Sequence, residues 1–340
     1  MARAFPPPSP DPAAPRTAAA RRLLAALAVL GAATAGAGLP EPVTHVYKRV
    51  DALEIKADVY APATGPRPRP VVVYLHGGSL VGGGRQKLDR REDLAERFLA
   101  AGYAVVSVDY RLAPETRLPG LVADVEDAFR WVRERGPELF AADPGRVAAW
   151  GSSAGGYLAF LTGFRVTPRP RVLLVEFGYA DIVGRWQTEP SRHADHHRHP
   201  ATTREEAWRV VAGPPIANSR DRAGDISVFN GYVRRHGEWP RAITGWDPVT
   251  EAEKFLPYLP VRQVTADYPP TFILHGREDT DIPYAVAEQM AAELARHGVE
   301  HRLVGIPGGE HGYAGADPAV VAAGLREGEA FVRRQLDRNR

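Results

Sequence analysis

The stretch Gly151-Ser152-Ser153-Ala154-Gly155 decides the fold of this chain. It follows an apolar run at residues 147–150 and precedes a helix-like stretch at residues 156–161. A strand-to-helix turn this sharp brings its flanking segments close together, so Gly151 and Gly155 occupy positions that tolerate little beyond a hydrogen side chain. The same strain aims the hydroxyl of Ser153 outward. The pentapeptide therefore indicates either a nucleophilic serine or an ordinary glycine-rich turn, and its partners decide between them.

Short apolar segments alternate with helix-like stretches along most of the chain. The expected strands are continuous apolar runs, as in strands buried on both faces of a sheet, at residues 71–75, 104–108, 147–150, 172–175, 271–274 and 301–304. The expected helices lie at residues 89–101, 121–135, 153–163, 284–296 and 318–338, and the second ends at Gly136-Pro137. This alternation predicts an α/β fold with a mostly parallel central sheet and helices on both faces.

Length and composition fit this fold. The 340 residues, 44% apolar and 25% charged, suffice for one sizeable α/β domain or two small ones. The formal charge is +2, but residues 1–37 hold four arginines and one aspartate, a net +3, which leaves −1 for the remainder. No basic patch is left to explain, so we expect no nucleic-acid partner. Only four lysines accompany the arginines, and we attribute this low number to genome composition; they are Lys48, Lys56, Lys87 and Lys254.

The N-terminus has the layout of a signal peptide. Arg21-Arg22 precede an apolar run at residues 23–30, and small residues follow. We expect a signal peptide and Pro-rich leader at residues 1–37, and one α/β domain at residues 38–340. The paired arginines would also suit a twin-arginine export signal. The protein is then secreted or periplasmic, without stable membrane association once the signal is cleaved. The alternative is a membrane anchor formed by an uncleaved helix.

Cysteine is absent from the chain. There is neither a disulfide framework nor a thiol for lipid attachment, so cysteine usage neither requires export nor argues against it.

A nucleophilic serine needs preorganised N–H donors for the oxyanion that forms when it attacks a carbonyl. His76-Gly77-Gly78-Ser79 follows the strand expected at residues 71–75. A Gly-Gly turn there leaves backbone N–H groups unobstructed beside the nucleophile. The oxyanion-hole candidates are therefore Gly77, Gly78 and Ala154, whereas His76 is expected to be a structural, hydrogen-bonded histidine.

The general base is sought among three histidines near the end of the chain. His297 lies on the face of an expected helix and His301 within an expected strand, so both are taken as ordinary residues. His311 stands in Pro307-Gly308-Gly309-Glu310-His311-Gly312, a glycine-rich loop directly after a strand. A side chain there can reach over the C-terminal edge of the sheet, which favours His311 as the base.

The acid that orients this base is sought after the strand expected at residues 271–274. Asp279 lies within the turn that follows the strand, and is the preferred candidate. Asp281 is the rival, and otherwise a capping carboxylate near the next helix. The order Ser153, Asp279, His311 is that of α/β-hydrolases, and differs from the order in the chymotrypsin and subtilisin folds.

Together these motifs resemble an α/β-hydrolase of the esterase/lipase group that includes the hormone-sensitive-lipase-like enzymes. The matching segments are His76-Gly77-Gly78, Asp109-Tyr110-Arg111-Leu112-Ala113-Pro114-Glu115, Gly151-Ser152-Ser153-Ala154-Gly155-Gly156, His275-Gly276-x-x-Asp279 and His311-Gly312. Ser79 replaces a third glycine, and Ser152 an aspartate of the lipase-like branch, so the broader carboxylesterase grouping is the safer label.

The resemblance implies hydrolysis of a small-molecule carboxylic ester through an acyl-enzyme, with no cofactor. It also implies an architectural role for the segment from Asp109 to Glu115, which would hold the loop under the turn through the charges of Arg111 and Glu115. A serine peptidase of the same fold and a catalytically silent binding protein remain alternatives. The sequence does not specify the oligomeric state.

The interval at about residues 179–269 interrupts the alternation, because it has no strong strand. An insertion this long is expected to form a helical cap. It collects aromatic residues, namely Trp186, Trp208, Phe229, Tyr232, Trp239, Trp246, Phe255 and Tyr258. Most of them are expected to form the core of the cap, with one or two lining the acyl pocket.

Two further patterns are interpreted without a ligand. The histidines of the insertion lie in a polar run that favours a solvated loop over a metal site; they are His193, His196, His197 and His199. Gly82-Gly83-Gly84 lacks the lysine that follows a phosphate-binding loop, so phosphate binding is not expected. No metal is expected.

Overall fold

The computed structural model describes Met1 and residues 38–338 of the chain. The expected signal peptide and leader lie outside the described residues, apart from Met1. Among the residues that are described, no helix is long and apolar enough to cross a membrane.

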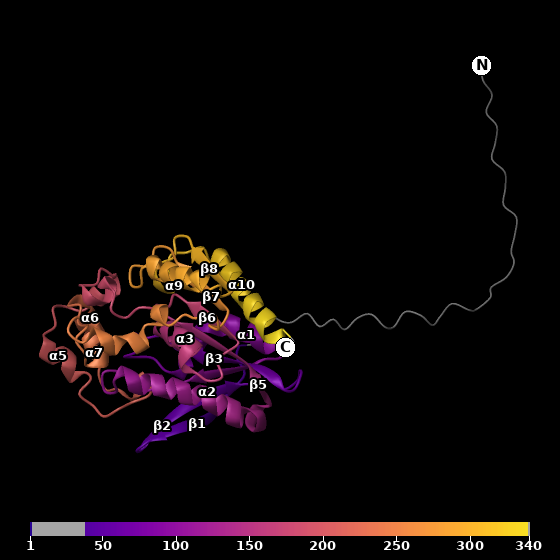
Figure 1. Ribbon diagram of the computed structural model, residues 1–340, viewed down its shortest axis with the longest axis horizontal. Helices are drawn as coiled ribbons and strands as arrows, with labels where there is room; N and C mark the ends of the chain where they lie inside the picture. The colour runs from indigo at the N-terminus through magenta and orange to yellow at the C-terminus, as the bar shows by residue number, and fades with distance from the viewer. Residues whose placement is uncertain (2–37, 339–340) are drawn as a thin grey trace. The chain divides into compact units, whose positions relative to one another are not determined.

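The body that begins at Gly38 is built on one eight-stranded sheet (Figure 1). Its strand order is β1-β2-β4-β3-β5-β6-β7-β8. The six strands from β3 to β8 run parallel to one another. Their bounds are β1 Val43–Val50, β2 Leu53–Tyr60, β3 Arg69–Leu75, β4 Ala104–Val108, β5 Ala142–Ser152, β6 Val172–Glu176, β7 Thr271–Gly276 and β8 His301–Ile306. The predicted mostly parallel α/β sheet is confirmed.

Helices cover both faces of the sheet (Figure 1). Their bounds are η1 Arg85–Arg91, α1 Glu92–Ala100, α2 Leu118–Phe140, α3 Ala154–Arg165, α9 Tyr284–Arg296, η6 His311–Tyr313 and α10 Pro318–Asp337. Alternate residues of β3 point to opposite sides, so Val71 and Val73 belong to the core on the face of α2, α3 and α9, whereas Val72 and Tyr74 belong to the core on the face of α1 and α10. This two-sided burial explains the continuous apolar runs of the central strands.

The sequence-based expectation missed β1 and β2. These two strands pair with each other in antiparallel fashion, and β2 pairs antiparallel with β4. Most residues of β1 are only half-buried or exposed. The strand therefore shows neither a continuous apolar run nor a clean alternation, which are the two signals by which strands are detected.

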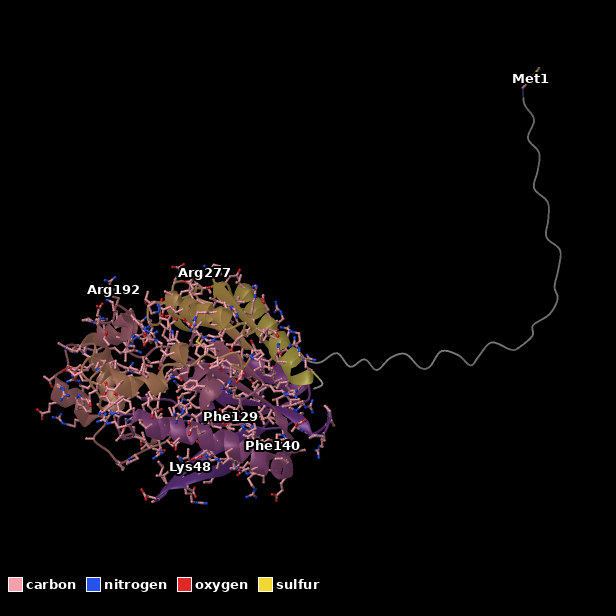
Figure 2. All side chains as sticks on the ribbon, viewed as in Figure 1. Met1, Lys48, Phe129, Phe140, Arg192 and Arg277 are labelled. Carbon is pink, nitrogen blue, oxygen red and sulfur yellow. The ribbon has the colours of Figure 1, made fainter. Side chains whose placement is uncertain are left out.

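The predicted end of the second helix at Gly136-Pro137 is wrong, because α2 continues to Phe140 (Figure 2). Proline removes one hydrogen bond within the helix. The last turn nevertheless buries the ring of Phe140, which lies against Gly136 and contacts Trp131 at a centroid distance of 6.0 Å. Apolar burial offsets the missing bond. The helix ends where Ala141 adopts left-handed backbone angles, φ 55° and ψ 40°.

Between β6 and β7 the chain forms only short helices, and residues 179–269 are all described. Their bounds are α4 Arg185–Thr188, η2 Ala194–His197, α5 Arg204–Arg209, η3 Ser219–Asp221, α6 Ile226–Arg235, α7 Trp239–Thr244, α8 Ala252–Phe255, η4 Leu256–Tyr258 and η5 Pro260–Arg262. Helices α5, α6 and α7 group at one side of the body in Figure 1. We call residues 179–269 the insertion.

Arg111 and Glu115 each connect the segment from Asp109 to Glu115 to a neighbouring element through an ion pair. Arg111 donates to Asp124 of α2, with Nε 2.7 Å from Oδ2. Glu115 accepts two bonds from Arg222 of the insertion, each 2.9 Å long, and both side chains are at most 4% exposed. The charges of Arg111 and Glu115 thus attach this segment to α2 and to the insertion, respectively.

We expect Glu115→Ala to lower the free energy of unfolding by roughly 3–5 kcal/mol, because it leaves the buried guanidinium of Arg222 unpaired. Urea unfolding followed by circular dichroism measures this change. The matched control is Glu189→Ala, which removes an exposed pair with Arg185 and should cost about 0–1 kcal/mol. Equal losses in the two variants would contradict a structural role for the buried pair.

Candidate active site

Ser153 stands at the sharp junction between β5 and α3. Its backbone angles are φ 55° and ψ −122°, and its N–H donates to the carbonyl of Glu176 at 2.9 Å. A Cβ added at Gly151 would collide with the carbonyl of Gly155, and one added at Gly155 would collide with the carbonyl of Leu75. Both bracketing glycines are therefore required by close backbone approach, as the sequence predicts.

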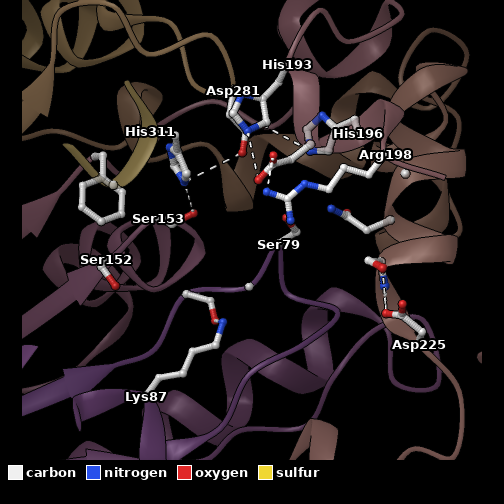
Figure 3. Close-up of a pocket in the computed structure, with 18 of the residues that line it drawn as sticks. Ser79, Lys87, Ser152, Ser153, His193, His196, Arg198, Asp225, Asp281 and His311 are labelled. Carbon is white, nitrogen blue, oxygen red and sulfur yellow. Dashed lines mark hydrogen bonds and ion pairs between the residues drawn. The ribbon is translucent and has the colours of Figure 1, made fainter. Parts of the chain in front are cut away.

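The structure brings the three predicted triad residues together, and two of them, Ser153 and His311, are labelled in Figure 3. Nε2 of His311 lies 3.1 Å from Oγ of Ser153, and Nδ1 of His311 lies 2.8 Å from Oδ2 of Asp279. The other carboxylate oxygen of Asp279 accepts backbone N–H bonds from Asp281 and Ile282, at 3.0 and 2.8 Å. These bonds hold the carboxylate of Asp279 in place beside the imidazole.

The turn that carries Asp279 and the loop that carries His311 are bonded to each other. Glu310 accepts the backbone N–H of Thr280 at 2.8 Å and the hydroxyl of Thr280 at 2.8 Å. A Cβ added at Gly276, at the end of β7, would collide with the carbonyl of Gly309. The acid and the base therefore share one packed unit. The sequence analysis did not identify Thr280 or Glu310. The only available indication was that they stand next to Asp279 and His311 in the chain.

The charges around His311 favour its protonated form. Burial lowers the pKa of His311, but the hydrogen bond to Asp279 and the charges of Asp281, Asp279 and Glu310 outweigh burial and raise it above the ordinary value. Burial raises the pKa of Asp279, yet hydrogen bonds from His275 and His311 lower it well below its usual range. Asp279 is thus an ionised partner for the imidazole.

Asp281, the rival acid, lies on the other side of the imidazole. Its Oδ2 is 3.8 Å from Nε2 of His311, the nitrogen that faces Ser153. Its Oδ1 accepts a bond from Arg234 at 2.9 Å, and Arg234 is buried. Asp281 is therefore a second carboxylate beside the base, whereas Asp279 occupies the orienting position at Nδ1.

Two of the predicted oxyanion-hole residues lie beside the serine turn. A Cβ added at Gly77 would be 2.8 Å from the carbonyl oxygen of Ser152 and 3.1 Å from Cβ of Ser153. Gly78 has φ +128°, a conformation that side chains rarely adopt. Ala154 is the first residue of α3, where backbone N–H groups have no partner within the helix.

His76 occupies the structural position that the sequence predicts. Its side chain is fully buried and stacks on Tyr110 at a centroid distance of 4.2 Å. Nδ1 of His76 lies 3.0 Å from the carbonyl oxygen of Gly77. Burial lowers the pKa of His76 to about 3, so the ring is neutral and Nδ1 donates to that carbonyl.

The triad opens into a cavity of about 590 Å³. None of the eight insertion aromatics named in the sequence analysis lines it, so the expectation that one or two would do so is wrong. They pack with one another instead, as in the Trp208–Phe229 and Trp246–Phe255 pairs. Polar side chains of the insertion line the cavity, namely His193, Asp195, His196, Arg198, His199, Asp225, Ser227 and Asn230.

The solvated-loop interpretation is wrong for two of the insertion's histidines. His196 is buried, with Nδ1 2.7 Å from Oγ of Ser191. His193 lies near the base, with ring centroids 6.2 Å apart, and its Nδ1 is 2.9 Å from Oγ1 of Thr280. The neighbouring Arg192 is exposed at the outer surface (Figure 2). Side chains three residues apart align in a 3-10 turn, so His193, the N-cap of η2, and His196 both face inward, which the composition of this polar run does not indicate.

The remaining histidine candidates stay outside the cavity. His297 follows the end of α9, and Nδ1 of His301 lies 2.9 Å from the carbonyl of Val299. Among the described residues, no group of three or more histidine and acidic side chains could hold a metal ion.

One aromatic contact at the triad was missed. Phe177 follows β6 at φ 37°, and its ring meets that of His311 edge-on at a centroid distance of 5.0 Å. The only sequence feature that could have indicated Phe177 is its position directly after a buried strand.

Comparisons with known proteins identify relatives of this chain. The family described as BD-FAE matches residues 57–171, which contain Gly77 and Ser153, and the prolyl oligopeptidase family matches residues 210–338, which contain Asp279 and His311. A non-reducing polyketide synthase of Stachybotrys bisbyi is 31% identical over 79% of this chain. The chain spans only 13% of that synthase's length.

Solved structures show the fold. Thermogutta terrifontis esterase 2 phosphonylated by sarin has a TM-score of 0.62 and 22% identity, covering 87% of this chain and 95% of that one. Its apo form has a TM-score of 0.61 and 21% identity with the same coverage. The chain therefore has the α/β-hydrolase fold.

Proposed function

We propose that this chain hydrolyses carboxylic esters, with Ser153 as nucleophile, His311 as general base and Asp279 as the acid that orients it. The observation that carries the proposal is the continuous hydrogen-bonded row from Asp279 through His311 to Ser153, with bonds of 2.8 and 3.1 Å. It stands at the C-terminal edge of the sheet and opens into the cavity. Nucleophile, base and orienting acid at these distances are the requirements of acyl transfer.

In the first half of the reaction, Oγ of Ser153 attacks the ester carbonyl carbon and its proton passes to Nε2 of His311. The carbonyl oxygen becomes an oxyanion, which backbone N–H groups of Gly77, Gly78 and Ala154 stabilise. Asp279 stabilises the imidazolium that forms. When this intermediate collapses, the bond between the carbonyl carbon and the alkoxide oxygen breaks, and His311 gives its proton to that oxygen. The alcohol leaves, and the acyl group remains on Oγ of Ser153 as the acyl-enzyme.

In the second half, His311 takes a proton from water as the water oxygen attacks the acyl carbon. The same N–H groups stabilise the second oxyanion. When this intermediate collapses, the bond to Ser153 Oγ breaks and His311 returns the proton to that oxygen. The products are a carboxylic acid and the free enzyme. These steps require only groups of this chain, water and the ester.

A peptidase is the second candidate, because the prolyl oligopeptidase family matches residues 210–338. Amide hydrolysis would use the same three side chains. A catalytically silent binding protein is the third, and the complete hydrogen-bonded row argues against it.

We expect Ser153→Ala and His311→Ala to lower kcat on p-nitrophenyl acetate by about 10⁶, because the nucleophile and the base act as a unit. The matched control is Ser152→Ala, since the hydroxyl of Ser152 lies 3.1 Å from the hydroxyl of Tyr74 rather than at the triad. This control should keep most of the activity. Persistent hydrolysis by either triad variant sinks the assignment.

Two further assays separate the competing functions on the wild-type chain. An ester should be cleaved faster than an aminoacyl anilide, and the opposite preference would favour the peptidase. A fluorophosphonate probe should form an adduct on Ser153. A folded chain that forms no adduct would favour the silent binding protein.

We expect Asp281→Asn to extend activity to lower pH. Catalysis needs neutral His311, and the charge of Asp281 raises the pKa of that imidazole. Removing the charge lowers the pKa, so the acidic limb of the kcat/KM profile moves toward lower pH. Arg234 loses a charged partner in this variant, so a melting curve checks that the protein still folds. A limb that stays fixed or moves to higher pH contradicts this electrostatic role.

We propose further that the protein is exported, on the basis of Arg21-Arg22 and the apolar run that follows them. Expressed with its full N-terminus, the protein should accumulate outside the cytoplasm with a mature end near residues 35–38. Mass spectrometry of the purified protein measures this end. An intact N-terminus in the membrane fraction would instead favour the uncleaved anchor.

A further inference from the structure

Lys87 lies in η1 and lines the cavity, where it is labelled in Figure 3. Its ammonium group donates to the carbonyl oxygen of Gly77, with Nζ 3.1 Å from the oxygen. The side chain is half-buried and lines the cavity together with Ser153. A cation is thus bonded directly to the turn that carries the oxyanion-hole candidates.

The same carbonyl accepts a second bond. Nδ1 of His76 lies 3.0 Å from the oxygen of Gly77. The ring of His76 is buried against Tyr110, so its donor is fixed in direction. Two donors, one of them charged, therefore converge on one carbonyl oxygen, and charge-assisted bonds are the stronger kind.

That carbonyl belongs to the same peptide group as the N–H of Gly78. In a trans peptide the C=O and the N–H are coplanar and point in opposite directions. Hydrogen bonds accepted at the oxygen polarise the group and strengthen the bond that its N–H donates. Donors on the carbonyl of Gly77 therefore act on whatever the N–H of Gly78 binds.

We propose that Lys87 is a positioning residue, which polarises the Gly77–Gly78 peptide and fixes its direction so that the N–H of Gly78 stabilises the oxyanion. The inference rests on the proposed function, because it needs an oxyanion to form at Ser153. It assigns Lys87 a role that acts through Gly78 and does not require contact with the substrate.

The neighbouring glycines preserve this arrangement. A Cβ at Gly83 would lie 2.5 Å from the oxygen of Gly77 and 2.5 Å from Nδ1 of His76, where it would disrupt the bond between them. A Cβ at Gly78 would lie 3.1 Å from Nζ of Lys87. Gly83 thus packs against the polarised peptide, which gives this glycine a steric role.

The test compares Lys87→Met, Lys87→Arg and the control Lys254→Met with the wild-type chain. Lys254 pairs with Glu251 on the surface and does not line the cavity. Losing a whole oxyanion donor lowers kcat by about 10²–10³, and cooperative strengthening is about 10–30% per bond, so Lys87→Met should lower kcat on p-nitrophenyl acetate roughly 2- to 8-fold. KM should change little, and Lys87→Arg should recover part of kcat.

A spectroscopic measurement separates polarisation from loss of structure. Infrared difference spectroscopy with labelled acyl carbon records the carbonyl stretch of the acyl-enzyme. Because a weaker hydrogen bond raises this frequency, the stretch should move to higher frequency in Lys87→Met and stay unchanged in Lys254→Met. Melting curves identify a variant that fails to fold. If Lys87→Met does not fold, Lys87→Gln replaces it, and Lys87→Arg should then show a smaller shift than Lys87→Gln.

The outcomes separate this inference from the proposed function. One outcome overturns only the role of Lys87. In it, the wild-type chain hydrolyses the ester, and kcat and the carbonyl frequency are the same in Lys87→Met as in Lys254→Met. A rise in KM confined to anionic esters, with kcat unchanged, also overturns it and indicates that Lys87 binds substrate directly. A wild-type chain without esterase activity overturns both proposals.

Discussion

The close backbone crossing at the C-terminal ends of β3 and β5 is the constraint on which the site depends. Gly155 lies against the carbonyl of Leu75, and Gly77 lies against the carbonyl of Ser152, so the serine turn and the turn after β3 are in van der Waals contact. Neither approach leaves room for a side chain. The strained angles of Ser153 persist because this packing on both sides determines them. Nucleophile and oxyanion donors are therefore positioned by one steric fit.

A second constraint is the charge on both sides of the base. Asp279 bonds to Nδ1 of His311, while Asp281 lies 3.8 Å from Nε2. The imidazolium that forms when Ser153 loses its proton is thus stabilised by two carboxylates, whose own pKa values lie below the ordinary range despite burial. The stabilisation is present before the substrate arrives. The same charges stabilise protonated His311 in the enzyme without substrate, and this form is inactive. The arrangement therefore makes His311 a better proton acceptor but lowers activity at low pH.

The parts of the structure that could be predicted are those with local signals. The turn around Ser153 and the loop of His311 follow from glycines next to buried strands, because backbone crossings select residue types directly. The end of α2 was mispredicted, since burial of Phe140 overrides the local effect of Gly136-Pro137. The inward position of His193 depends on contacts with a loop about 90 residues later, which no local pattern encodes.

The insertion is joined to the sheet by two buried ion pairs, and both end on loops at the edge that carries the triad. Arg222 pairs with Glu115, and Arg234 pairs with Asp281. Buried pairs contribute little net stability compared with apolar packing, but they fix one geometry, because a displaced partner leaves a charge unpaired. The pair at Asp281 also faces His311. The element that shapes the cavity and the charge that tunes the base are consequently linked, so changes in the insertion that move Arg234 alter the chemistry as well as the shape of the site.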